Sequence, residues 1–102
     1  MYGVMFKWTP PSGKEPELIK DFKEVADFAK GAGALSTNVY KDAETGEYIG
    51  IQMWPSQEFY YSWFNETNFE FRSSQPARYV ELVKKIKDVY KCTYLRELQQ
   101  IF

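Results

Sequence analysis

The sequence contains no histidine among its 102 residues, and its only cysteine is Cys92. Without an imidazole the chain cannot form a Ser-His-Asp or Cys-His nucleophile, a histidine proton shuttle, or a histidine ligand to zinc or haem. A lone cysteine cannot form an intrachain disulfide, and no base lies near it in the sequence. We therefore expect an inert, buried thiol in a cytoplasmic protein.

Three further features are missing. No stretch approaches the roughly 18 apolar residues that a membrane helix requires, and no basic segment followed by a long apolar run marks a secretory signal. The formal net charge is −1 and no run of Lys or Arg is present, which disfavours binding to nucleic acid. Asp42, Glu44 and Glu47 are too few and too closely spaced to form a metal site. We expect turn or solvent-exposed roles for them, and we predict neither a metal nor a cofactor.

Aromatic side chains are abundant instead, at 19% of the residues. Much of this surface falls within residues 54–71, as Trp54, Phe59, Tyr60, Tyr61, Trp63, Phe64, Phe69 and Phe71. A chain of this length forms one domain with a limited interior, so it has little room for so many large rings. We expect the excess aromatic surface to line a cavity or to face a partner.

Alternating apolar residues predict strands over residues 2–8, 35–41, 47–54 and 90–98, with a hairpin turn at residues 42–46. Between the first two strands, helical spacing predicts a helix that begins near Pro16 and ends at Gly31 and Gly33. A later helix is expected to follow Pro76, with an apolar stripe of Tyr79, Val80, Val83 and Ile86.

A further helical segment is predicted from Ser56, as the capping residue, to about Glu66. Its aromatic residues cover a broad arc, wider than a helix needs for packing on a sheet. In one interpretation they line a cavity, over which the alternating residues 68–71 fold as a lid. In the plainer interpretation Phe59, Trp63 and Phe64 belong to the core, and Tyr60 and Tyr61 are partly exposed.

This order of elements predicts one α+β domain over residues 1–102, with a βαββαβ arrangement. Its four-stranded antiparallel sheet carries helices on one face. The strands have apolar residues in both parities, including Met5, Ile49, Ile51 and Met53. The face that the helices leave uncovered is therefore expected to meet a second copy of the chain.

The βαββαβ order, the length near 100 residues and the apolar residues on both faces of the sheet resemble the dimeric α+β barrel group of ferredoxin-like proteins. That group includes the antibiotic-biosynthesis monooxygenases. The resemblance implies a homodimer in which two sheets face each other, with a pocket between sheet and helices in each protomer. Because the group contains enzymes, sensors and members without known activity, the fold alone does not decide the function.

Cofactor-independent monooxygenases of this group orient aromatic substrates with asparagine, tryptophan, tyrosine and arginine. The same residue types supply our ligand-pocket candidates, which are Asn38, Trp54, Tyr60, Trp63, Asn65 and Arg78. No catalytic residue is assigned. The leading prediction is a homodimer that binds a small apolar or aromatic molecule, and the alternatives are a cofactor-independent monooxygenase and a non-catalytic dimerisation module. A cavity under roughly 100 Å³, against the usual 300–1,000 Å³, would favour the module.

Overall fold

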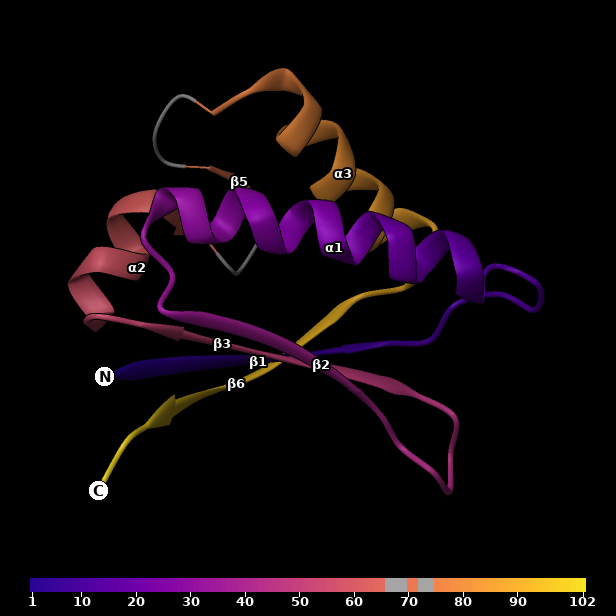
Figure 1. Ribbon diagram of the computed structural model, residues 1–102, viewed down its shortest axis with the longest axis horizontal. Helices are drawn as coiled ribbons and strands as arrows, with labels where there is room; N and C mark the ends of the chain where they lie inside the picture. Colours follow the sequence, from indigo (N-terminus) through magenta and orange to yellow (C-terminus); the bar gives the residue numbers. More distant parts are fainter. Residues whose placement is uncertain (66–69, 72–74) are drawn as a thin grey trace.

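The computed structural model describes residues 1–65, 70–71 and 75–102 (Figure 1). The elements follow one another as β1 (Tyr2–Trp8), α1 (Glu15–Ala32), β2 (Ser36–Lys41), β3 (Tyr48–Trp54), α2 (Gln57–Trp63), β4 (Phe64–Asn65), β5 (Glu70–Phe71), α3 (Ala77–Asp88) and β6 (Thr93–Gln99). Four of the strands form one sheet in the order β2-β3-β1-β6, and every neighbouring pair is antiparallel. The predicted α+β fold is confirmed.

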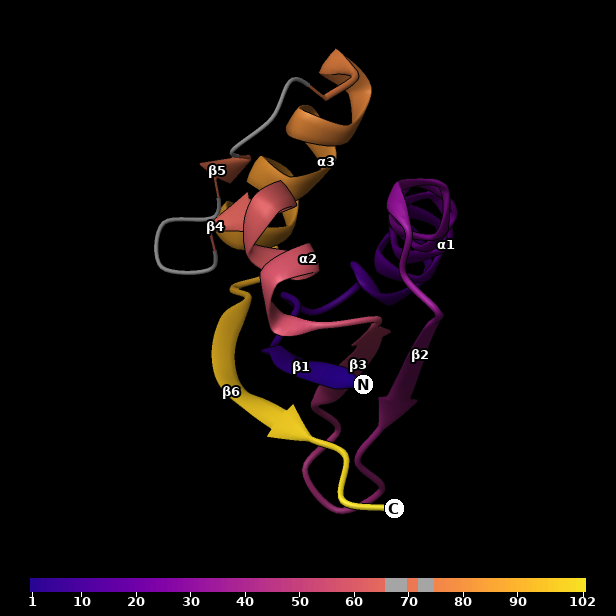
Figure 2. The ribbon, with the colours of Figure 1, turned by 90° about the vertical axis from the view of Figure 1, so that its left-hand side faces the viewer.

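The helices lie on one face of this sheet (Figures 1 and 2). The apolar residues at even positions of β1 face them and are buried, from Val4 at the centre to Trp8 at the end of the strand. The opposite face carries Met5 beside Ile51, with Met53 and Ile49 on either side of Ile51 along β3. These four central residues of the open face are apolar and only partly exposed, and β2 and β6 bend away from the helices on the two sides of this face (Figure 2).

Helix α1 has the bounds that its sequence pattern predicts. Pro16 occupies the first turn, where its missing N–H removes no intrahelical hydrogen bond. Gly33 ends the helix with φ of 120°, a conformation that side chains oppose, and its N–H bonds to Lys30 O at 3.1 Å. Leu18 and Phe22 are buried against the sheet side as expected, but the polar Asp21 is buried beside them.

The predicted end of helix α2 near Glu66 is wrong. The helix starts as expected, with Ser56 Oγ accepting a hydrogen bond from Phe59 N at 3.1 Å, but it ends at Trp63. Phe64 is already extended, because residues 64–65 pair with residues 70–71 as the short strands β4 and β5. Glu66 and the first half of the predicted lid, residues 68–69, lie outside the described residues.

The plainer interpretation of the α2 aromatics is partly wrong as well. Tyr60 is completely buried and lies on the same face as Trp63, three residues later. Phe59 is instead 41% exposed, and its ring packs against Gly33. The core therefore takes the Tyr60 face of the helix, and the Phe59 face covers the end of α1.

Two predictions near the C-terminus need correction. In α3 the buried stripe contains Leu82 in place of Val80, which is 38% exposed. The last strand begins at Thr93 and not at Tyr90, because Lys91 adopts a left-handed conformation with φ of 57° and turns the chain between α3 and β6. None of the described helices is both long and apolar enough to cross a membrane.

Candidate functional site

Trp54, Tyr60 and Trp63, three of the predicted pocket residues, lie together where β3 passes into α2. The Trp54 ring lies 5.4 Å from that of Tyr60 and 4.8 Å from that of Trp63, measured between centroids. All three side chains are buried, and Tyr79 of α3 extends the cluster with its ring 5.4 Å from Trp63. Trp54 and Tyr60 are thus protein core, whereas Trp63 and Tyr79 border a cavity.

That cavity lies between the sheet and the helices. Its lining comes from β1 and β3 below, from α1 and α3 above, and from the residues around the end of α2. The lining residues are Phe6, Trp8, Val25, Gln52, Trp63, Phe64, Tyr79, Val83, Ile86 and Cys92. Its volume is about 50 Å³. Gln52 contributes a side-chain amide to this lining, which otherwise consists of aliphatic and aromatic residues and Cys92.

Gly50 makes room for the tryptophan on the floor of this cavity. Gly50 pairs with Phe6 across β1 and β3, and the next pair on the same face of the sheet is Tyr48 with Trp8. A Cβ atom at Gly50 would lie 2.1 Å from Cη2 of Trp8, well inside any real contact distance. The six-membered ring of Trp8 therefore occupies the space above Gly50, and the indole also packs on Phe22 with ring centroids 4.2 Å apart.

Trp8 is only 7% exposed, and its buried Nε1–H has no hydrogen-bond partner among the described residues. A buried donor without an acceptor costs about 1–3 kcal/mol. Gln52 lies on the same face of β3, two residues beyond Gly50, and its Oε1 accepts a hydrogen bond of 3.2 Å from Trp54 Nε1. With its oxygen engaged, Gln52 can offer its amide N–H groups.

Two further lining groups stay protonated. Burial raises the pKa of the Cys92 thiol and of the Tyr79 phenol well above their ordinary values. Neither a thiolate nor a phenolate is therefore available at neutral pH, which supports the predicted inert role of Cys92. The lining contains no lysine, arginine, aspartate or glutamate, so it offers hydrogen bonds but no charge.

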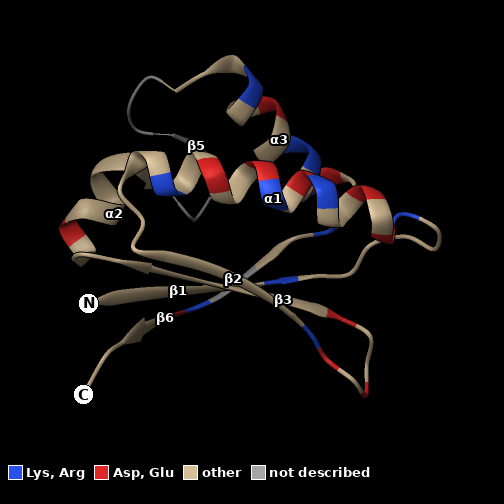
Figure 3. Cartoon of the chain, in the orientation of Figure 1, with Lys and Arg blue, Asp and Glu red and all other residues tan. Residues whose placement is uncertain are grey.

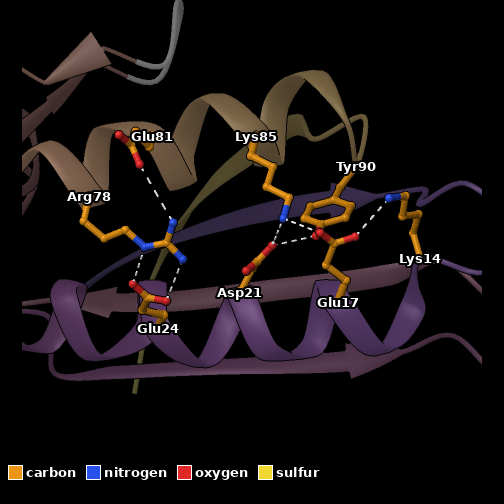
Figure 4. A network of polar contacts seen from close by, with 8 residues as sticks. All are labelled: Lys14, Glu17, Asp21, Glu24, Arg78, Glu81, Lys85 and Tyr90. Carbon is orange, nitrogen blue, oxygen red and sulfur yellow. Dashed lines mark hydrogen bonds and ion pairs between the residues drawn. The ribbon is translucent and has the colours of Figure 1, made fainter.

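Arg78 does not belong to this cavity but to a network of polar contacts between α1 and α3 (Figure 4). Its guanidinium donates two hydrogen bonds to Glu24, at 2.7 and 3.0 Å, and the side chain is 52% exposed. Further along the same two helices Lys85 lies 2.8 Å from Asp21 and 2.6 Å from Glu17. These contacts hold the helices together, and Arg78 does not line the cavity.

The two asparagines do not join the cavity lining either. Asn38 pairs with Ile51 in the β2–β3 register, which places it on the open face of the sheet, away from the helices. Asn65 lies in the backbone of β4, and its side chain is outside the described part of the structure. Asp42 caps the hairpin turn by accepting hydrogen bonds from the N–H groups of Glu44 and Thr45 at 2.8 and 3.2 Å. No group of three or more Cys, Asp or Glu side chains within residues 1–65, 70–71 and 75–102 could hold a metal ion.

Sequence reasoning missed Trp8 and Gln52 as site residues. A signal for Gln52 was present, because the helix-facing positions of β3 are Tyr48, Gly50, Gln52 and Trp54, and glutamine breaks this otherwise non-polar series. The glycine in the same series marks the close approach of another group. That the group is Trp8 depends on the pairing of β1 with β3, which is visible only in the folded chain.

A family model, antibiotic biosynthesis monooxygenase, matches residues 1–71 of the chain. Solved structures share the fold at low identity. One, an antibiotic biosynthesis monooxygenase, has a TM-score of 0.71 at 12% identity and 99% coverage of both chains. The Mycobacterium tuberculosis protein Rv0793 has a TM-score of 0.67 at 16% identity, covering 99% of this chain and 98% of that one. A Deinococcus radiodurans protein assigned to the same family has a TM-score of 0.66 at 13% identity, covering 96% and 88%. No curated protein sequence matches the chain.

Proposed function

Since the chain belongs to the antibiotic biosynthesis monooxygenase family, we propose that it is a homodimer that binds a small apolar or aromatic molecule. Each protomer holds its ligand in the cavity between sheet and helices. The observation that carries this proposal is the lining of that cavity, which is apolar and aromatic with a small number of polar groups. Such a lining is typical of small-molecule sites.

The proposed dimer interface is the open face of the sheet. Met5, Ile49, Ile51 and Met53 form an apolar patch there, bordered by two basic residues, Lys7 and Arg96, which pair with Ile49 and Met5; Lys and Arg are blue in Figure 3. A contiguous apolar face on a small protein is a typical site of association. Two copies facing each other through this surface would form the barrel that the family resemblance implies.

Light scattering after size-exclusion chromatography tests the dimer at micromolar concentration. We expect the wild type to have twice the mass of one chain. Ile51→Lys should give a monomer, because it places a charge at the centre of the patch. Val80→Lys is the control, since Val80 is an exposed valine on α3, on the other side of the molecule. A wild type that is strictly monomeric would refute the dimer.

The volume of about 50 Å³ limits what the cavity can hold without rearrangement. A monocyclic ligand requires the side chains on α1 and α3 to move outward. Binding is measured by titrating ¹⁵N-labelled protein with α-methylstyrene, a neutral aromatic hydrocarbon, and following the amide resonances of residues around the cavity. Val25→Phe should abolish binding by filling the cavity from α1, whereas the same change at Val80, which is exposed on α3 and does not line the cavity, should leave it intact.

The second candidate function is a dimerisation module without a ligand, and the small cavity favours it, because about 50 Å³ falls below the roughly 100 Å³ that separates the two predictions. Absence of saturable binding by any neutral aromatic compound, together with a stable dimer, would establish this alternative. The monooxygenase is supported less well. Asn38 and Arg78, two of the residues suggested for it, do not line the cavity, so no cation is available to stabilise an oxyanion there.

A further inference from the structure

We propose that the cavity selects ligands carrying a neutral hydrogen-bond-accepting oxygen, such as a ketone or aldehyde carbonyl, and that Trp8 Nε1–H and the Gln52 amide bind this oxygen. The inference rests on the proposed binding function and adds the chemical class of the ligand. It concerns two residues that the family resemblance did not suggest. Both lie on the floor of the cavity, on the neighbouring strands β1 and β3.

The placement of the two donors follows from the register of the strands. The Trp8 ring extends from β1 over Gly50 of β3, and Gln52 is the next residue of β3 on the same face. Residues two apart on one face of a strand are neighbours. Because Gly50 has no side chain, no β3 side chain lies between Gln52 and the six-membered ring of Trp8, whose Cη2 and Cζ3 lie over Gly50.

The hydrogen bonds already present leave donors and no acceptor at this point. Trp8 can only donate, and its Nε1–H has no partner among the described residues. Gln52 accepts from Trp54 through Oε1, which leaves its amide nitrogen as the group available to a ligand. A ligand that brings an acceptor oxygen satisfies the buried indole, whereas a hydrocarbon of the same shape leaves it unsatisfied.

The oxygen must be neutral because no basic side chain lines the cavity. Arg78, the basic residue that the sequence suggested for the pocket, is engaged by Glu24 at 2.7 Å. A carboxylate would lose its hydration without gaining a cation, which is strongly unfavourable in an apolar cavity. The geometry therefore favours carbonyl compounds over both hydrocarbons and carboxylates.

The test compares three probes of similar shape on the wild-type protein. Acetophenone carries a carbonyl oxygen, α-methylstyrene has a CH₂ group in its place, and benzoate carries a carboxylate. Each is titrated into ¹⁵N-labelled protein while the indole N–H resonances of the three tryptophans are followed. We expect acetophenone to bind about three- to tenfold more tightly than α-methylstyrene, as one or two neutral hydrogen bonds imply, and benzoate not to bind.

The indole signals identify the donor directly. Acetophenone should shift the Trp8 Nε1–H proton downfield in a saturable manner, and α-methylstyrene should not. Trp8→Phe keeps an aromatic ring and removes one donor, so it assigns the signal and should remove the larger part of the acetophenone preference, leaving only the part that the Gln52 amide contributes. Gln52→Met should reduce the preference in part. If Trp8→Phe does not fold, assignment of the wild-type indole signals by through-space contacts still decides the question.

The outcomes separate this inference from the proposed function. Equal affinity for acetophenone and α-methylstyrene, with an unmoved Trp8 indole proton, would overturn the carbonyl preference and leave the binding function standing. Tighter binding of benzoate would also overturn it, because it would require a cation at the site. Absence of binding by all three probes would refute both the inference and the proposed function.

Discussion

The Tyr90 hydroxyl donates a hydrogen bond of 2.6 Å to Oδ2 of Asp21, across 69 positions in the sequence. Both side chains are buried, and the same carboxylate oxygen lies 2.8 Å from Lys85 Nζ. A hydroxyl and an ammonium group thus compensate one buried charge. The three residues join α1 to α3, the two helices whose side chains form the upper wall of the cavity.

Removing the Tyr90 hydroxyl is expected to destabilise the protein. Tyr90→Phe loses a hydrogen bond to a buried charged group, so the free energy of unfolding should fall by about 1.5–3 kcal/mol. Urea unfolding followed by fluorescence measures the change. Tyr40→Phe is the matched control, because Tyr40 is 56% exposed on the edge strand β2, and it should change stability by no more than about 0.5 kcal/mol. Equal effects of the two changes would contradict the structural role of the contact.

Asp21 should also make stability depend on pH. Burial alone would raise the pKa of its carboxyl group, but the hydrogen bonds from Lys85 and Tyr90 outweigh burial and lower the pKa. An unfolded-state aspartate has a pKa of about 3.9. The stabilisation is therefore complete above that value and is lost as the pH falls through the lower folded-state pKa.

The comparison of wild type with Asp21→Asn isolates this carboxyl group. The difference in their free energies of unfolding should be constant from about pH 5 to pH 7 and should shrink between about pH 4 and pH 2. The lowered pKa values of Glu17 and Glu24 arise chiefly from their bonds to Lys85 and Arg78, which both proteins retain, whereas the small opposing effect of the Asp21 charge on Glu24 is lost in the variant. A difference that grows on acidification would show that the sign is wrong.

Two glycine substitutions should have opposite effects. Gly50→Ala places a Cβ 2.1 Å from the Trp8 ring, so we expect the loss of about 1–3 kcal/mol that follows from overpacking a core. Gly31 lies within α1 with no atom within 4 Å of an added Cβ, and Gly31→Ala should stabilise the helix by about 0.5–1 kcal/mol. Thermal unfolding of both variants provides the measurement. Stabilisation by Gly50→Ala would mean that the indole does not occupy this space.

The thiol of Cys92 should react slowly. Because burial raises its pKa, little thiolate exists at pH 8, and reaction with a disulfide reagent should be at least about tenfold slower than in the urea-unfolded protein. The absorbance of the released thiolate follows the reaction. If acetophenone or α-methylstyrene occupies the cavity, it should slow the reaction further, since Cys92 lines that cavity. Equal rates for folded and unfolded protein would place the thiol on the surface.

Most of the fold was predictable because its signals are local. Pro16 and Gly33 mark the two ends of α1, and alternation identifies the central strands β1 and β3. The errors occur where a distant contact overrides a local pattern. Helical spacing favours continuing α2 beyond Trp63, but pairing with residues 70–71 draws Phe64 into a strand. Tyr90 looked like the start of a strand, yet its hydroxyl is bound to Asp21 of α1.

The candidate site was predictable only in part. Trp63, one of the residues that the aromatic segment suggested, lines the cavity. The same excess of aromatic residues drew attention away from Gln52 and from Trp8, which stands on the first strand far from the segment. Arg78 was selected for its charge, and that charge is used by Glu24 on α1.

Strand β1 occupies the middle of the sheet, with Tyr2 paired to Trp54 on one side and to Gln99 on the other. During synthesis β1 must therefore wait for β6 before both of its edges are hydrogen-bonded. Contacts between such distant positions raise the contact order and slow folding. Until Gln99 has emerged from the ribosome, the edge of β1 that pairs with β6 has no partner strand. During this interval the nascent chain is most prone to pair with another chain.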